Sequence, residues 1–148
     1  WLQFSELSIE QLYDILQLRE AVFTQEQQCK DIDVDGVDKH SWHLLMLENA
    51  ELQAYARAYE HDESIHIGRV IVRKSARGRG LARELMQTLL TQLKAQFPKL
   101  IITLSAQSYL QAFYESLNFV VTSAEPYDEG GIEHVAMQLS SIKVITIT

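Results

Sequence analysis

The sequence predicts an α/β domain in which helices flank a mixed central β-sheet. Short apolar runs alternate with segments of helical periodicity, and a long leucine-rich amphipathic segment separates two apolar runs. Turn-forming residues fall between these segments, and no internal repeat, low-complexity stretch or linker interrupts them. The predicted order is β-α(α)-β-β-β-α-β-α-β-β, and residues 1–148 are expected to form a single domain.

The N-terminal part is predicted to form a short strand and a broken helix. Trp1 to Phe4 gives the strand. Ser8-Ile9-Glu10-Gln11 has the form of a capping box, which opens a helix that runs to about Gln28. A break near Thr24 would divide this helix in two, and an acidic loop from Asp31 to Asp38 follows it.

Three successive strands are predicted in the middle of the chain. Trp42 to Leu47 and Leu52 to Tyr59 are apolar runs separated by a short polar turn, which is typical of a β-hairpin. A second turn at Glu60 to Ser64 leads to the strand from Ile65 to Val72. Strands joined by such short turns are expected to be antiparallel neighbours.

The leucine-rich helix is predicted over Gly80 to Gln96, and Pro98 ends it. Leu100 to Leu104 is then a buried strand. Because it follows a strand and a helix, it should run parallel to the Ile65 strand through a right-handed crossover.

The C-terminal part is predicted to hold one more helix and a last pair of strands. The helix covers about Ser108 to Leu117. Phe119 to Ser123 and His134 to Leu139 form the strands, with a glycine-containing connection between them. Ile142 to Ile147 has the composition of a strand, but the pattern gives it no place in the sheet.

Composition excludes several classes of function. The net charge of −7 argues against nonspecific nucleic-acid binding, which needs a broad basic face. No apolar run reaches the roughly 18 residues of a membrane span, and the first residues do not resemble a secretion signal, so a cytoplasmic protein without membrane contact is expected. Cys29 is the only cysteine and is expected to be a packing residue rather than a reactive thiol.

The turn between the Ile65 strand and the leucine-rich helix is predicted to bind an anion. Six of the 13 Lys and Arg residues lie between Arg69 and Arg83, a stretch without Asp or Glu. Gly78, Gly80 and Ala82 allow a ligand to approach the backbone, and the first turn of a helix offers unpaired N–H groups to phosphate. The alternative is a surface loop with solvated arginines.

Several motifs together resemble the GCN5-related N-acetyltransferase (GNAT) superfamily, and within it the ElaA-like group. The resemblance covers Phe4 to Met137, and the element order agrees with it. It rests on Arg77-x-x-Gly80-x-Ala82, Ala112-Phe113-Tyr114, Leu117-Asn118-Phe119, Leu18-Arg19-x-x-Val22-Phe23, Glu26-Gln27-x-Cys29, Asp33-x-Asp35-Gly36-x-Asp38 and Gly131-Ile132-x-His134.

The resemblance implies that the chain binds acetyl-coenzyme A as co-substrate. The diphosphate would lie on the backbone of Arg77, Gly78, Arg79, Gly80, Leu81 and Ala82. The pantetheine arm would add to the strand at Val70, Ile71 and Val72, as a peptide adds to a sheet edge, and the following parallel strand would have to splay away. Gln107 stands where the superfamily often has a cofactor-binding asparagine, and Asn118 replaces a frequent glycine.

The resemblance further implies that Tyr114 protonates the departing thiolate, the alternative being a tyrosine that only packs. An alkylamine acceptor is about one part in 10³ neutral at pH 7, so some group must remove its proton. The candidate bases are Glu26, His43, Glu129 and His134, with Asp33 and Asp35 nearer the surface. Glu26 is favoured, because burial at the end of an apolar helix would raise its pKa.

The acidic loop leaves three interpretations open. Asp31-x-Asp33-x-Asp35-Gly36 copies the start of a calcium-binding EF-hand loop, but Trp42 stands where the bidentate glutamate belongs. A solvated turn and a negative rim that attracts cationic amines are the other two. His40-Ser41-Trp42-His43 has loose metal-ligand spacing without a third ligand, so no metal is expected.

The expected function is transfer of an acetyl group from acetyl-coenzyme A to a primary amine, carried by a small molecule or a peptide, through direct attack in a ternary complex. The alternative is a noncatalytic acyl-coenzyme A binding or sensor module on the same fold. A nucleoside-triphosphate enzyme is disfavoured, because no Gly-Lys-Ser/Thr sequence ends the glycine motif. A homodimer is compatible with the sequence.

Overall fold

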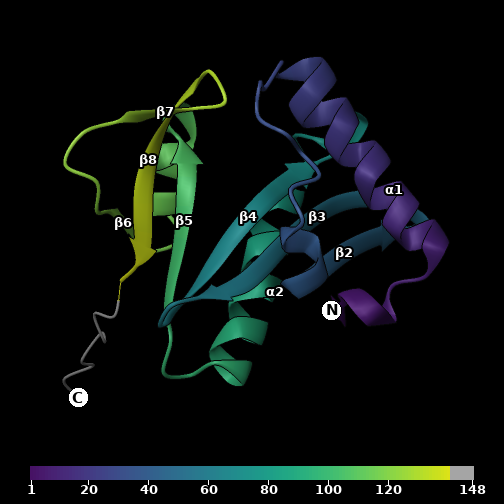
Figure 1. The fold of residues 1–148 in the computed structure, drawn as a ribbon, viewed down its shortest axis with the longest axis horizontal. Helices are drawn as coiled ribbons and strands as arrows, with labels where there is room; N and C mark the ends of the chain where they lie inside the picture. Colours follow the sequence, from purple (N-terminus) through teal and green to yellow (C-terminus); the bar gives the residue numbers. More distant parts are fainter. Residues whose placement is uncertain (141–148) are drawn as a thin grey trace.

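A computed structural model describes residues 1–140 of the chain, and the tail strand suggested for Ile142 to Ile147 lies outside this range. The described part contains an eight-stranded mixed sheet flanked by helices, which confirms the predicted fold class. Figure 1 shows α1 on one face of the sheet and α2 on the other. The elements are β1 (Leu2–Gln3), α1 (Ile9–Arg19), β2 (Trp42–Glu48), β3 (Glu51–His61), β4 (Ser64–Val72), α2 (Leu81–Gln96), β5 (Ile101–Gln107), α3 (Gln111–Glu115), β6 (Phe119–Val121), β7 (Tyr127–Glu129) and β8 (Ile132–Leu139).

The strand order in the sheet is β1-β2-β3-β4-β5-β8-β6, with β7 paired to β8. All neighbours are antiparallel except β4 and β5, which are parallel as predicted. The sequence predicts two strands after α3, whereas the structure has three, because Tyr127–Glu129 pairs with the start of β8.

The first helix begins and breaks for local reasons. Ser8 is its N-cap, and its hydroxyl accepts from the Gln11 amide while the Gln11 side chain accepts from the Ser8 amide, which confirms the capping box. α1 ends at Arg19 and continues as a π-helix over Glu20–Glu26, so the break comes earlier than Thr24. π-Helical turns inside helices are frequent at functional sites.

The structure has a hydrophobic cluster on each face of the sheet, and β3 contributes side chains to both. Ala54, Ala56 and Ala58 point to α2, where their small side chains let the leucines of the helix pack closely. Tyr55 points to the opposite face, where Ile15 of α1 packs against it. The alternation of side chains along one strand therefore places a helix on each face.

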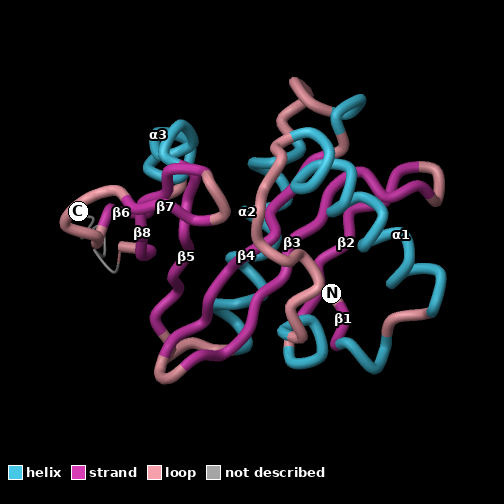
Figure 2. The backbone as a smooth tube through the Cα atoms, turned by 45° about the horizontal axis from the view of Figure 1, so that its top comes forward, coloured by secondary structure: helices cyan, strands magenta, loops and turns pink. Residues whose placement is uncertain are grey.

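β4 and β5 separate part-way along their length. Their pairing runs only from Ser64 opposite Ile101 to Ile67 opposite Leu104, and β4 then continues to Val72 without β5 beside it. Figures 1 and 2 show the two strands meeting at one end and diverging toward the other.

A β-bulge in β4 lies at the point of separation. Tyr55 pairs with Ile71 and Arg57 with Gly68, so β4 has one residue more than β3 between these pairs. Arg69 takes up the difference with a φ of 52°. A bulge bends the strand that carries it and increases its twist, which turns the end of β4 away from β5.

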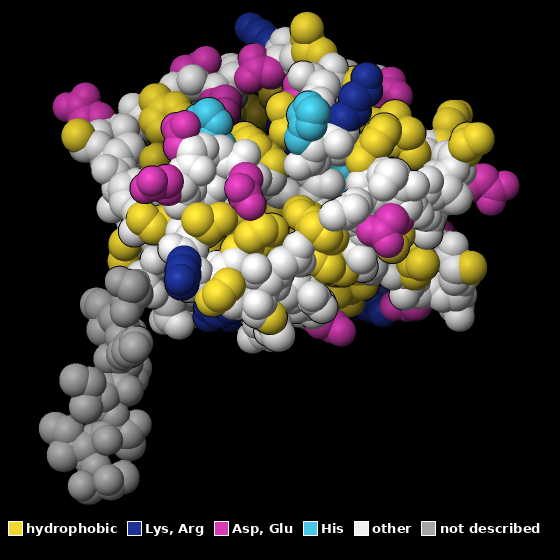
Figure 3. Space-filling model, turned by 60° about the horizontal axis from the view of Figure 1, so that its bottom comes forward, with side chains coloured by type: hydrophobic (Ala, Val, Ile, Leu, Met, Phe, Trp, Pro, Cys, Tyr) yellow, Lys and Arg dark blue, Asp and Glu magenta, His cyan; other side chains and the backbone are white. Residues whose placement is uncertain are grey.

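The surface agrees with the acidic composition. On the face shown in Figure 3, basic side chains are few and separated from one another. In residues 1–140, no helix is long and apolar enough to cross a membrane.

Candidate active site

A cleft of about 300 Å³ opens where β4 and β5 part. One wall is β4 from His66 to Val70, and the other is β5 with the ends of β7 and β8. The end of the π-helix and the acidic loop form a third side. The separation predicted for the parallel strand is therefore present in the structure.

The N-terminus of α2 adjoins the end of β4. Gly78 and Gly80 have φ of 79° and 77°, in the left-handed region that favours glycine, and no atom lies within 4 Å of the position of a Cβ on either residue. At this end of the helix, the Glu84 amide donates to the Gly80 carbonyl at 3.2 Å. The amides of Leu81 to Arg83 thus come before the first amide that donates within the helix. They have no acceptor within residues 1–140 and can bind an anion.

The arginines of this loop are engaged by carboxylates. Arg77 makes a two-pronged contact with Glu26, with nitrogen–oxygen distances of 2.5 and 2.9 Å. Arg79 lies 2.6 Å from a carboxylate oxygen of Glu48. Exposed pairs of this kind are worth about 0–1 kcal/mol, so an incoming diphosphate can compete for both guanidinium groups.

The pKa argument for Glu26 is wrong. Its side chain is about one-third exposed, and the hydrogen bond with Arg77 lowers the pKa of Glu26 instead of raising it. A carboxylate with a lowered pKa is a weaker base. A catalytic role for Glu26 stays a prediction, now without the physical reason that favoured it.

Tyr114 lies on α3 with its ring packed edge-on against Phe113 and Phe119. Its side chain borders the cleft, and its hydroxyl makes no hydrogen bond with any residue in the described range 1–140. Burial raises the pKa of Tyr114 to about 12, so the phenol keeps its proton at neutral pH.

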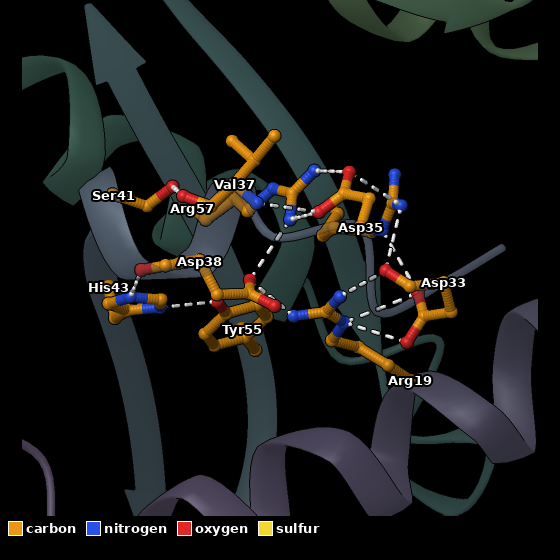
Figure 4. Close-up of polar contacts among 10 residues, drawn as sticks. Arg19, Asp33, Asp35, Val37, Asp38, Ser41, His43, Tyr55 and Arg57 are labelled. Atoms are coloured by element: carbon orange, nitrogen blue, oxygen red, sulfur yellow. Dashed lines mark hydrogen bonds and ion pairs between the residues drawn. The ribbon is translucent and has the colours of Figure 1, made fainter. Parts of the chain in front are cut away.

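The acidic loop is held by arginines, as Figure 4 shows. Asp38 accepts from Arg19 at 2.6 Å and from Arg57 at 2.9 Å. Asp35 accepts from Arg57 at 2.7 Å, which contributes to lowering the pKa of Asp35 to about 2 against the opposing effect of burial.

Asp33 completes this cluster. Its carboxylate accepts from Arg19 of α1 at 3.1 Å and from Arg69 of the bulge at 3.0 Å. Three aspartates and three arginines balance in charge, so Asp33, Asp35 and Asp38 do not form the negative rim that was one interpretation of the loop. The cluster instead ties the acidic loop to α1, β3 and the bulge of β4.

A second polar cluster lies on the other wall of the cleft. The Ser105 hydroxyl donates to Glu129 at 2.9 Å and lies 2.5 Å from the Tyr127 hydroxyl. His134 places Nε2 3.4 Å from the same Glu129 oxygen, and its Nδ1 lies 2.7 Å from the Ile132 carbonyl. Glu129 is about half exposed, so this cluster connects the cleft with solvent.

Two hydrogen bonds bridge the walls of the cleft. Gln107 donates to the Gln27 side chain at 2.7 Å, and the Lys30 amide donates to the Gly130 carbonyl at 2.9 Å. A Cβ on Gly130 would collide with the sulfur of Cys29, which accounts for glycine there. Cys29 is thus a contact residue of this bridge and borders the cleft.

Comparison with known proteins decides the family. A profile described as "Acetyltransferase (GNAT) domain" matches residues 8–141. The chain belongs to the GNAT acetyltransferase family. It is 43% identical over 141 residues to Protein ElaA of Escherichia coli, with 92% of each chain covered.

Solved structures agree with the assignment to the GNAT family. The crystal structure of Escherichia coli ElaA superposes with a TM-score of 0.88 at 42% identity, covering 94% of this chain and 96% of the other. An acyl-CoA N-acyltransferase from Pseudomonas aeruginosa gives 0.89 at 35% identity, with the same coverage. The chain is an acyltransferase of the ElaA-like group, as the resemblance implied.

Two features of this GNAT cleft escaped the sequence analysis. His66 borders the cleft, but it lies inside an apolar strand run and was not among the candidate bases. His43 was a candidate, yet its side chain is fully buried. Its ring nitrogens bond the Tyr55 hydroxyl and the Asp38 carbonyl, so it cannot reach a substrate. Within residues 1–140, no group of three or more His, Cys, Asp or Glu could hold a metal ion.

Proposed function

We propose that this GNAT protein transfers an acetyl group from acetyl-coenzyme A to a primary amine, by direct attack in a ternary complex. The observation that supports it most is the parting of β4 and β5 beside the free amides of α2. An extended amide-bearing arm can enter between the strands while an attached diphosphate meets the helix N-terminus. A nucleotide alone would use only the helix N-terminus and would leave the space between the strands empty.

The cofactor is proposed to lie along β4 and the loop after it. Backbone groups of Val70, Ile71 and Val72 would bond the pantetheine arm, and the amides of 77–82 (Arg77, Gly78, Arg79, Gly80, Leu81 and Ala82) would hold the diphosphate. The Gln107 amide nitrogen donates to Gln27, and its carbonyl oxygen has no partner within residues 1–140, so that oxygen would accept from the arm. A backbone N–H of β4 would stabilise the oxyanion that forms on the thioester carbonyl.

The acceptor is proposed to be a cationic amine that enters from the side of the acidic loop. Asp31 and Glu129 border the cleft and have no Arg or Lys partner within residues 1–140. The other three carboxylates of the loop are neutralised by arginines. Two cleft-lining carboxylates without an Arg or Lys partner in the described residues favour an ammonium group over an anionic acceptor.

The proposal is tested by a thermal-shift screen followed by an acceptor panel. Acetyl-coenzyme A and coenzyme A are expected to raise the melting temperature, and ATP is not. Thiol release is then measured with spermidine, Nα-acetyl-lysine amide, a peptide with a free N-terminus and kanamycin. Release that depends on an amine supports the proposal, whereas binding without release from any acceptor favours the noncatalytic module.

Glu26→Gln tests whether Glu26 is the base. We expect kcat to stay within about twofold of the unsubstituted value, because Glu26 bound to Arg77 is not expected to act as the base. Loss of a true general base would typically lower kcat by about 10²–10⁴-fold. Coenzyme A should bind at least as tightly, since Arg77 no longer has a competing carboxylate. Steady-state kinetics and calorimetry measure both quantities, and a kcat lower by about 10²-fold at unchanged KM would restore Glu26 as the base.

A further inference from the structure

His66 occupies the point where the sheet opens. It pairs with Thr103 of β5 in the parallel register, one position before the pairing ends. Its ring is half-buried, contacts the Tyr59 ring at a centroid distance of 5.5 Å, and borders the cleft. His66 therefore lies in the last part of β4 that pairs with β5, at the border of the cleft where the two strands separate.

The hydrogen bonds around His66 fit the tautomer protonated at Nδ1. Nδ1 lies 3.1 Å from the Thr103 hydroxyl oxygen, and that oxygen lies 3.5 Å from the Ile65 carbonyl. A hydroxyl that donates its one proton to the Ile65 carbonyl can accept the Nδ1 proton of the histidine. In this tautomer Nε2 holds the lone pair, and it has no hydrogen-bond partner among residues 1–140.

The charges around His66 keep the ring neutral. Burial lowers the pKa of His66 from its ordinary value, and Arg57 and His61 of β3 lower it further. Glu129 of β7 opposes them by raising it. The remaining neighbours, Tyr59 and Thr103, are uncharged. An imidazole that is neutral at pH 7 with an unshared lone pair is suited to accept a proton.

Each of the other candidate bases has a partner within residues 1–140. Glu26, Asp33 and Asp35 bind arginines, and Glu129 accepts from the Ser105 hydroxyl. His43 is buried with both ring nitrogens bonded. His134 places Nε2 beside a Glu129 oxygen and bonds a carbonyl through Nδ1. His66 differs from them, because it borders the cleft and its Nε2 has no partner in the described residues.

We propose that His66 is the general base, which rests on the function proposed above. The ammonium group first loses one proton to solvent, and the neutral nitrogen attacks the thioester carbonyl. The new C–N bond forms, and the nitrogen gives a second proton to Nε2 of His66. The C–S bond then breaks, its electron pair stays on sulfur, and the thiolate takes the proton of Tyr114. His66 returns its proton to solvent along the exposed side of Glu129, and Tyr114 regains one from solvent.

The test is the pH dependence of His66→Gln with acetyl-coenzyme A and whichever of the four panel amines reacts fastest. In the unsubstituted protein, kcat should rise with pH through a value below about 6.5 and then level off, because only the neutral ring accepts a proton. His66→Gln should lose this acidic limb and at least about tenfold of kcat at pH 7.5. Glutamine retains a polar side chain toward Thr103, so the melting temperature and the Kd of coenzyme A should be unchanged.

His61→Gln is the matched control, because His61 lies at the exposed end of β3, away from the cleft. It should keep kcat and an acidic limb, and the midpoint of that limb should rise slightly because His61 lowers the pKa of His66. If His66→Gln keeps them too, His66 is not the base, while the proposed function stands. If the unsubstituted protein acetylates none of the four amines, the proposed function fails and this proposal fails with it. Loss of the limb in both variants would also overturn the assignment.

Discussion

Asp38→Ala is expected to lower the free energy of unfolding by about 3–5 kcal/mol, the usual effect of removing one partner from a buried ion pair. One oxygen of Asp38 accepts from two guanidinium groups, those of Arg19 and Arg57, whose side chains are 0% and 4% exposed. Without the carboxylate, both cations stay in the interior with less compensation. Urea unfolding at pH 7 measures the difference.

The unsubstituted protein and Asp38→Ala also test how the free energy of unfolding depends on pH. The folded state lowers the pKa of Asp38, and that of Asp35 to about 2, so both carboxylates contribute stability above their unfolded pKa. That contribution disappears as the pH falls from about 5 toward 2, and the difference between the two proteins should shrink with it.

Asp14→Ala is the control, because Asp14 lies exposed on α1. It should change stability by less than about 0.5 kcal/mol at pH 7. An Asp38→Ala protein that unfolds at the same urea concentration as Asp14→Ala would show that the cluster contributes nothing to stability.

Tyr114→Phe is expected to lower kcat by about 10²-fold, the lower end of general-acid effects. The ring packs edge-on against Phe113 and Phe119, and phenylalanine keeps those contacts, so KM for acetyl-coenzyme A should change by less than about twofold. Only the hydroxyl and its proton are lost. Steady-state thiol release under saturating substrate measures kcat.

Tyr109→Phe provides the comparison, since Tyr109 is 72% exposed on the neighbouring turn. It should keep the kcat of the unsubstituted protein. If Tyr114→Phe also keeps it, Tyr114 is a packing residue and the thiolate leaves without an acid.

Local signals predicted most of the fold. The capping box at Ser8, the proline after α2 and the alternation of apolar and turn residues each act within a few residues, so they can be recognised in sequence. Gly78 and Gly80 before α2 are signals of the same kind, because their positive φ is a local requirement. β7 was missed because all three of its residues are exposed and its composition is polar.

The polar chemistry of the cleft depends on contacts between distant residues. Glu26 and Arg77 are 51 positions apart, and their contact reversed the pKa direction expected for Glu26. The arginines that neutralise the acidic loop come from α1, β3 and the bulge, 14 to 36 positions away along the chain. Periodicity and spacing do not show which distant residues form ion pairs. The aspartates of the acidic loop were therefore open to interpretation as a negative rim.

The central claim is that the free amides at the start of α2 hold the diphosphate while the arm of the cofactor lies between β4 and β5. A crystal structure of the complex with coenzyme A tests this most directly. The account predicts diphosphate oxygens about 2.7–3.2 Å from backbone nitrogens within residues 77–82, and the arm beside β4 beyond Ile67. Coenzyme A bound at another surface, with these amides facing only water, would contradict it.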